Sequence, residues 1–156
     1  MLILFLTLLF FSIDFFFKKF VQQTFSFNTG YHLIKNIVDL RLVHNTGAAF
    51  GMLRDKTLFL IFLGIILLAI FFVWARKMRY SFLRKIFISM ILGGALCNLY
   101  DRIVFGYVID YIDLGWWPVF NLSDTFISVG CILLIISYLH EDARKKKTDN
   151  LAKSSS

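Results

Sequence analysis

The run from Thr57 to Trp74 constrains the fold of this chain more than any other feature. Its eighteen consecutive residues carry no charge, and most of them are Leu, Ile or Phe. As an α-helix the run would be about 27 Å long at about 1.5 Å per residue, close to the roughly 30 Å of a bilayer's hydrocarbon core. A helix that is apolar on every side has no face to offer to water. The run therefore predicts a transmembrane helix.

Three other apolar segments have similar lengths. Together with residues 57–75 they give four predicted spans, the others being residues 1–21, 86–103 and 121–139. The first segment lacks a basic start and a small-residue cleavage site, so we expect it to be retained as a span. Hydrophobic residues make up 58% of the 156-residue chain, which leaves too little polar surface for a water-soluble fold. We predict an all-α membrane protein with four transmembrane helices, a single integral domain over residues 1–156.

Two longer loops, residues 22–56 and 104–120, join the first span to the second and the third to the fourth. Apolar and polar residues alternate from Ile37 to Val43, which is the pattern of a β-strand. Residues 45–51 are mostly small, so the backbone can approach another element closely there. We expect the two loops to form a small β-sheet or lip outside the membrane.

Basic residues indicate the orientation of the spans. Five Lys or Arg residues fall within residues 76–85 and five more within the tail, residues 140–156. The positive-inside rule therefore places both termini in the cytoplasm and both longer loops on the extracytoplasmic side. We interpret the formal charge of +7 as a topology signal and not as a nucleic-acid-binding surface. The basic tail, which ends in three serines, is predicted to be disordered.

Four of the ten acidic residues lie within residues 93–124, next to the outer ends of two spans: Asp101, Asp110, Asp113 and Asp124. Asn98, Asp101 and Arg102 would share the outer end of the third span. Charges there are costly unless they are paired or hydrogen-bonded. The group is therefore either part of a polar site or a structural ion pair between helix ends. Small residues at every fourth position of the same span predict close packing of a second helix, namely Ser89, Gly93 and Cys97.

Asp14 and Lys18 place a second polar pair in the first span. Their spacing of four residues puts the carboxylate and the ammonium on one helical face, where they attract each other. The alternative is that Lys18 only anchors the end of the helix at the bilayer boundary.

Two aspartates flank the second loop and can meet near one depth. Asn121 precedes Asp124 by three residues, which predicts that Asn121 caps the fourth helix and that Asp124 lies in its first turn. Asp110 lies at the other end of the loop. Two adjacent carboxylates share a proton, so that one activates water and the other polarises a carbonyl, as in aspartic proteases. Asp110 and Asp113 would face opposite sides of a strand, and the residues alone do not choose between them.

Other kinds of function fit the sequence less well. A metal site needs grouped ligands, and His32 and His44 lack that spacing, so no metal or cofactor is expected. A serine mechanism lacks a lysine or histidine near Ser123 or Ser128. An ion-coupled transporter would carry its acids nearer the midplane of the bilayer. A non-catalytic scaffold for helix association gives no reason for several polar residues at one depth.

Several motifs, in their order along the chain, resemble the lipoprotein signal peptidase (signal peptidase II) family from about residue 10 to residue 140. They are Asp14 to Lys18, Asn45-Thr46-Gly47-Ala48-Ala49-Phe50, Gly93-Gly94-Ala95 with Asn98 and Asp101-Arg102, Val108-Ile109-Asp110, and Phe120-Asn121-Leu122-Ser123-Asp124. The resemblance implies a multi-pass aspartic endopeptidase of the bacterial inner membrane, with its active site near the extracytoplasmic face. Its substrates would be prolipoproteins, cut just N-terminal to their diacylglyceryl-modified cysteine. Membrane lipids are the other expected partners, and nothing in the sequence demands more than a monomer.

The resemblance also implies which residues form the site. Asp110 and Asp124 match the catalytic pair of the family, which leaves Asp113 as a solvent-facing residue. The supporting residues that it implies are Asp14, Lys18, Asn45, Gly47, Asn98, Asp101, Arg102 and Asn121.

Three features depart from the family pattern. Cys97 stands where a glycine is usual, and we expect the packing there to admit a small thiol. Ser123 replaces a usual alanine, and we expect its hydroxyl to bond to Asp124. The stretch between Asp110 and Asp124 is several residues shorter than usual, which predicts a trimmed lip over the site.

Overall fold

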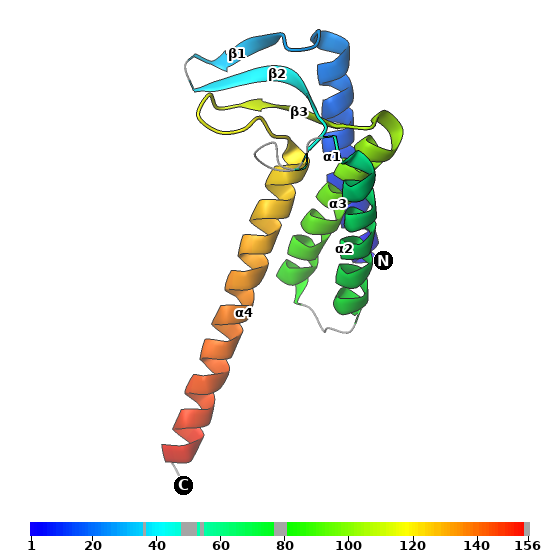
Figure 1. The fold of residues 1–156 in the computed structure, drawn as a ribbon. Coiled ribbons are helices and arrows are strands. Elements are labelled where there is room, and N and C mark those ends of the chain that lie inside the picture. Colours follow the sequence, from blue (N-terminus) through cyan, green and yellow to red (C-terminus); the bar gives the residue numbers. More distant parts are fainter. Residues whose placement is uncertain (36, 48–52, 54, 77–80, 155–156) are drawn as a thin grey trace.

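The computed structural model describes every residue except 36, 48–52, 54, 77–80 and 155–156. Four helices and a small sheet make up the described chain (Figure 1). The helices are α1 (Leu2–Thr24), α2 (Thr57–Arg76), α3 (Phe82–Phe105) and α4 (Leu122–Ser154). The strands are β1 (Gly30–Ile34), β2 (Val38–Asn45) and β3 (Val108–Asp113).

Glycines on α3 bring two other helices into close contact with it. A Cβ atom on Gly93 would lie 2.7 Å from the Cβ of Phe10 and 2.8 Å from the carbonyl oxygen of Thr7, both on α1. A Cβ atom on Gly94 would lie 2.5 Å from the carbonyl oxygen of Ser123 on α4. The close packing predicted for this part of α3 is confirmed, and Cys97 is accommodated there as a fully buried thiol.

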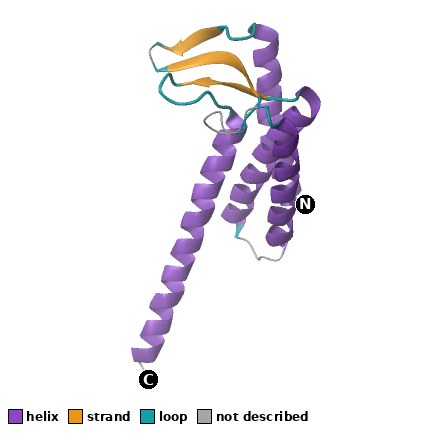
Figure 2. Ribbon diagram, in the orientation of Figure 1, coloured by secondary structure: helices purple, strands orange, loops and turns teal. Residues whose placement is uncertain are grey.

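The three strands form an antiparallel sheet in the order β1-β2-β3, as predicted for the two loops (Figure 2). Strand β2 comes from the first loop and β3 from the second, with Val43 opposite Asp110 and Asn45 opposite Val108. Gly106, in the left-handed conformation at φ 80°, ends α3 and turns the chain into β3. The sheet lies at one end of the helices and both termini lie toward the other end (Figure 1). The pairing of β2 with β3 places residues about 65 positions apart in the sequence next to each other.

Within the part of the chain that the structure describes, three helical segments are long and apolar enough to cross a membrane: Thr57–Ala75, Phe82–Phe105 and Leu122–Arg144. Helix α1 has a similar length but carries Asp14, Lys18 and Lys19. The assignment of α1 as a transmembrane span, and with it the extracytoplasmic placement of the sheet, therefore stays a prediction.

Two helices extend beyond the ends predicted for their spans. Helix α3 begins at Phe82 and not at residue 86, because Ser81 caps it by accepting a bond from the backbone N–H of Arg84. Helix α4 continues through the tail to Ser154, where disorder was expected. Residues 140–154 are rich in Lys, Arg, Ala and Leu, which are good helix formers, and this propensity extends the helix. Residues 48–51 of the small-residue run and 77–80 of the basic segment lie outside the described residues.

The close contact at Gly94 generates a stability prediction. Gly94→Ala should lower the free energy of unfolding by about 1–3 kcal/mol, because the new methyl group overlaps the backbone of Ser123. Gly64→Ala is the matched control, since its methyl group would lie an ordinary 3.6 Å from Leu99 and should leave stability unchanged or slightly higher. Thermal unfolding of the two purified variants in one detergent measures the difference. Equal melting temperatures would contradict the packing described here.

Candidate active site

Asp110 is buried in the middle of β3, with 1% of its surface exposed. Both oxygens of its carboxyl group accept hydrogen bonds from side-chain amides. Asn45 Nδ2, on β2, donates to Oδ2 over 2.8 Å, and Asn121 Nδ2 donates to Oδ1 over 2.7 Å. The backbone N–H of Gly47 donates to Asn45 Oδ1, which turns the amide nitrogen of Asn45 toward Asp110.

Asp124 lies in the first turn of α4, as predicted. Its backbone N–H donates to Asn121 Oδ1 over 2.8 Å, and the backbone N–H of Asn121 donates back to Asp124 Oδ2 over 3.3 Å. These reciprocal bonds are a capping box, so the predicted cap at Asn121 is confirmed. Asn98 Nδ2, on α3, donates to the other oxygen, Oδ1, over 2.8 Å.

Asn121 connects the two aspartates. Its amide nitrogen binds Asp110, while its amide oxygen and its backbone bind Asp124. The same nitrogen also approaches Asn98 Oδ1 at 3.1 Å and Ile109 O at 3.2 Å. Because Asn121 is fully buried and bonded on every side, it holds the carboxylates of β3 and α4 in one fixed arrangement.

Burial, and then the negative charge of Asp124, raise the pKa of Asp110 to about 7. The amides of Asn45 and Asn121 act in the opposite direction, because a hydrogen bond donated to a carboxylate favours its ionised form. Burial and repulsion outweigh them. With this pKa, Asp110 stays largely protonated below about pH 7, well above the pH at which an ordinary aspartate ionises.

Arg102 lies beside the two acids without joining them in an ion pair. Its Nη2 donates to Gly47 O over 3.1 Å, and its Nη1 reaches Asn98 O at 3.4 Å. The charges of Asp124 and Asp110 attract the guanidinium group. Arg102 therefore ties α3 to the segment that follows β2.

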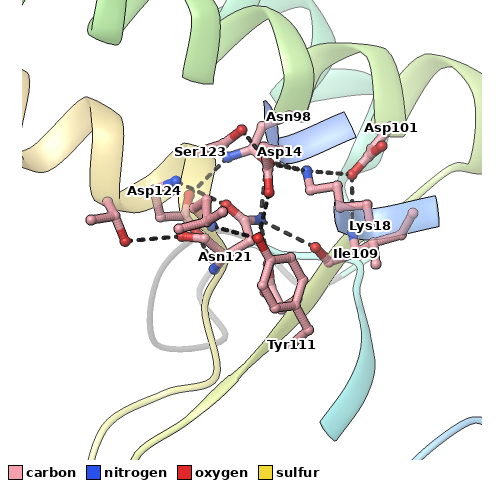
Figure 3. A network of polar contacts seen from close by, with 12 residues as sticks. Asp14, Lys18, Asn98, Asp101, Ile109, Tyr111, Asn121, Ser123 and Asp124 are labelled. Atoms are coloured by element: carbon pink, nitrogen blue, oxygen red, sulfur yellow. Dashed lines mark hydrogen bonds and ion pairs between the residues drawn. The ribbon is translucent and has the colours of Figure 1, made fainter. Parts of the chain in front are cut away.

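Lys18 forms the centre of a second polar cluster, which lies between α1 and α3 (Figure 3). Its Nζ binds Asp101 Oδ2 at 2.7 Å, Asn98 Oδ1 at 2.8 Å and Asp14 Oδ2 at 3.1 Å. Only 1% of Lys18 is exposed, so the alternative that it anchors a helix end at the bilayer surface is wrong. Asn98 belongs to both clusters and connects Lys18 to Asp124.

Two hydroxyl groups complete this cluster, one from Tyr111, which the sequence did not single out, and one from Ser123, for which it predicted another partner. Tyr111 donates its hydroxyl to Asp14 Oδ1 over 2.6 Å, and Ser123 donates its hydroxyl to Asp14 Oδ2. The expected bond from Ser123 to Asp124 is therefore wrong, because the hydroxyl points toward α1. Tyr111 is fully buried since α1 covers the face of β3 opposite Asp110, with the ring of Phe17 4.8 Å away. Its only signal in the sequence is a phenol next to Asp110 in the strand Val108–Asp113.

The remaining candidates lie outside this site. Asp113 binds Arg41 at 2.8 Å and only 14% of its side chain is exposed, so it is paired on the sheet and not simply solvent-facing. His32 binds Asp39 at 2.7 Å on an exposed part of the sheet. His44 stacks on another aromatic ring of the sheet region. Across the residues that the structure describes, no three His, Cys, Asp or Glu side chains gather as a metal site would require.

Comparison with known proteins gives one consistent result. The sequence model of a family described as signal peptidase (SPase) II matches residues 6–140. The chain is 41% identical over 132 residues to a lipoprotein signal peptidase of Syntrophomonas wolfei, covering 83% of this chain and 87% of the relative. It is 38% identical over 119 residues to one of Halothermothrix orenii, covering 76% and 82%. A solved bacterial membrane enzyme shares 28% identity with a TM-score of 0.86, covering 92% of this chain and 90% of its own.

The raised pKa of Asp110 predicts how stability depends on pH. Between about pH 4, where an aspartate of the unfolded chain titrates, and about pH 7, the folded state keeps a proton that the unfolded state releases. Stability due to this group is therefore present below that window and is lost as pH rises through it. Asp110→Asn cannot titrate and should remove this loss. Melting curves from about pH 5 to about pH 8 should show wild type falling relative to the variant.

Asp113→Asn, which removes a carboxylate of the same strand that pairs with Arg41, is the matched control for this comparison. It should retain the pH dependence of the wild type. Parallel curves for wild type and Asp110→Asn would contradict the protonation described here.

Proposed function

The chain belongs to the signal peptidase II family, and from that premise we propose that it is an endopeptidase that removes signal peptides from bacterial prolipoproteins. The bond that it cuts lies just N-terminal to the diacylglyceryl-modified cysteine. The observation that carries the proposal is the pair of aspartates, buried Asp110 and half-buried Asp124, which a single asparagine holds together. No metal or cofactor takes part in this proposal.

The proposed enzyme crosses the bacterial inner membrane four times as one domain, with both termini in the cytoplasm. Helix α1 fits as the first of these spans because Asp14 and Lys18 are buried and paired within the helices and need not face lipid. Both termini lie toward the end of the helices that is opposite the sheet (Figure 1). Arg84 and Lys85 also begin α3 at its far end from Gly106, which agrees with a cytoplasmic location of that end.

The proposed substrate fits the depth of the two acids. A cysteine that carries a diacylglyceryl group is held at the membrane surface, so its preceding peptide bond lies near the boundary of the bilayer. Asp110 and Asp124 lie where the sheet meets the helices, which is the same boundary in the proposed orientation. The largely exposed apolar side chains of α2 would contact lipid and the acyl chains of the substrate.

The two carboxyl groups hold one proton between them, and the reaction follows from its position. Asp110 is the better site for the proton, since burial and the charge of Asp124 raise its pKa to about 7. Ionised Asp124 takes a proton from a water molecule, whose oxygen then attacks the carbonyl carbon of the peptide bond. Asp110 donates its proton to the carbonyl oxygen. The tetrahedral intermediate collapses as the C–N bond breaks, and the amine of the cysteine takes the proton held by Asp124. As the C=O bond of the new carboxyl group forms, one hydroxyl proton of the intermediate returns to Asp110, which restores the starting protonation of both acids.

Amide side chains position the acids in this reaction. Asn45 and Asn121 fix both oxygens of Asp110, and Asn98 fixes Asp124 Oδ1. Arg102 holds Gly47 and through it Asn45. Preorganised donors of this kind need no rearrangement during the reaction.

The first test of this function removes each acid in turn. Asp110→Asn and Asp124→Asn should each lower cleavage of a purified lipidated prolipoprotein by at least about 100-fold, because neither amide can carry the shared proton. Asp113→Asn is the matched control, since Asp113 lies three residues further along β3 and pairs with Arg41 away from the acids. It should keep near-normal turnover, measured as the gel shift of the cleaved product. Activity retained by either Asp110→Asn or Asp124→Asn in a folded protein would refute the aspartate pair.

A second test addresses the substrate. The same precursor, prepared with and without its diacylglyceryl group, should be cut only when lipidated, because the lipid brings the scissile bond to the depth of the acids. A metal chelator should leave the rate unchanged. Equal cleavage of both precursors would contradict the proposed substrate, and strong inhibition by the chelator would contradict the mechanism.

A further inference from the structure

Each proposed catalytic aspartate is adjacent in sequence to a residue with a buried hydroxyl group. Tyr111 follows Asp110 in β3, and Ser123 precedes Asp124 in α4. The two hydroxyls donate to different oxygens of the same carboxylate, that of Asp14 in α1 (Figure 3). One carboxyl group therefore binds the neighbours of both acids.

These bonds join three elements at one point. The Tyr111 hydroxyl, besides donating to Asp14, accepts a bond from the backbone N–H of Leu122 over 3.1 Å, so β3 is also tied directly to the start of α4. Tyr111, Ser123 and Asp14 are each fully buried. Lys18 lies 3.1 Å from Asp14 and 2.7 Å from Asp101, so its ammonium offsets the charge of the carboxylate that accepts both hydroxyls.

We propose that Asp14, Tyr111 and Ser123 form a hydroxyl clamp that sets the separation of Asp110 and Asp124. This inference rests on the proposed function, because it assigns positioning roles around the proposed catalytic pair. Among the described residues, the hydroxyls of Tyr111 and Ser123 donate to Asp14 and not to Asp110 or Asp124. Each therefore acts on the neighbouring aspartate through the backbone of its own element. Successive side chains of a strand point to opposite faces, which places Tyr111 behind β3 while Asp110 faces the site.

The separation of the two acids matters for two reasons. Reacting groups must be held close to their productive geometry, and a displacement of about 1 Å can cost on the order of 100-fold in rate. The repulsion between two carboxylates also depends on their distance, and it sets how far apart the two apparent pKa values of the pair lie. A looser clamp should therefore reduce turnover and bring these two values closer together.

The test removes one hydroxyl at a time. Tyr111→Phe and Ser123→Ala should each lower kcat about tenfold with little change in KM, because substrate contacts are untouched while the acids are less well held. The bell-shaped dependence of kcat on pH should also narrow by at least about half a pH unit. Merely structural hydroxyls would not change the width of this profile.

Two matched controls come from hydroxyls that are buried without a hydrogen-bond partner among the described residues, those of Tyr138 and Thr7. Tyr138→Phe and Thr7→Val remove a buried hydroxyl without removing a bond, so both should keep the kcat and the pH profile of the wild type. A double-mutant cycle supplies a measurement that is independent of catalysis. The effects of Tyr111→Phe and Ser123→Ala on melting temperature should be non-additive, because both act on Asp14.

Failure of the clamp and failure of the proposed function give different results. If wild type cuts the precursor and Asp110→Asn does not, the function stands whatever the hydroxyl variants do. The clamp is then overturned if Ser123→Ala and Tyr111→Phe match their controls in kcat and profile width, or if they change only KM or only melting temperature. Should Tyr111→Phe fail to fold, Ser123→Ala decides between these outcomes, since it deletes a single oxygen atom.

Discussion

The arrangement of the helices depends on the pairing of the buried Lys18 ammonium group with acids of α1 and α3. A charge removed from water costs several kcal/mol unless it is paired and hydrogen-bonded, and Lys18 has 1% of its surface exposed. Asp14, Asp101 and Asn98 bind it within 3.1 Å. These partners come from α1 and α3, so the charge is compensated only when the two helices are packed in this one way.

The two proposed catalytic acids show the opposite situation. Asp110 and Asp124 accept bonds from neutral amides, and their charges repel each other. The protein thus neutralises the buried acids Asp14 and Asp101 with a lysine, and leaves buried Asp110 and half-buried Asp124 with excess negative charge. Asn98 binds both groups, which connects the stable cluster to the pair whose protonation matters for the proposed reaction.

The length and pattern of the apolar runs were enough to predict the helices and the small sheet, and the spacing of Asn121 and Asp124 predicted the capped start of α4. Helices α3 and α4 extend further into the charged segments than the apolar runs alone predict. Arg84 precedes the apolar run of the third span. In α3 it bonds to Ser137 and pairs with Glu141 at 2.5 Å, so its charge is compensated across the helices. The tail was expected to be disordered because it is basic, but its residues favour the helix that continues through it.

The order of residues alone could establish a membrane protein with acids gathered near the ends of its spans, because helical and strand periods and the placement of charges are local properties. The family motifs in the sequence also pointed to most of the residues that surround Asp110 and Asp124. Only the tertiary structure decided which groups meet. Ser123 turns from its neighbour Asp124 to Asp14, and Tyr111 is buried on the far side of β3 by α1. Contacts between residues about 100 positions apart depend on how helices pack, and no local pattern in the chain specifies that packing.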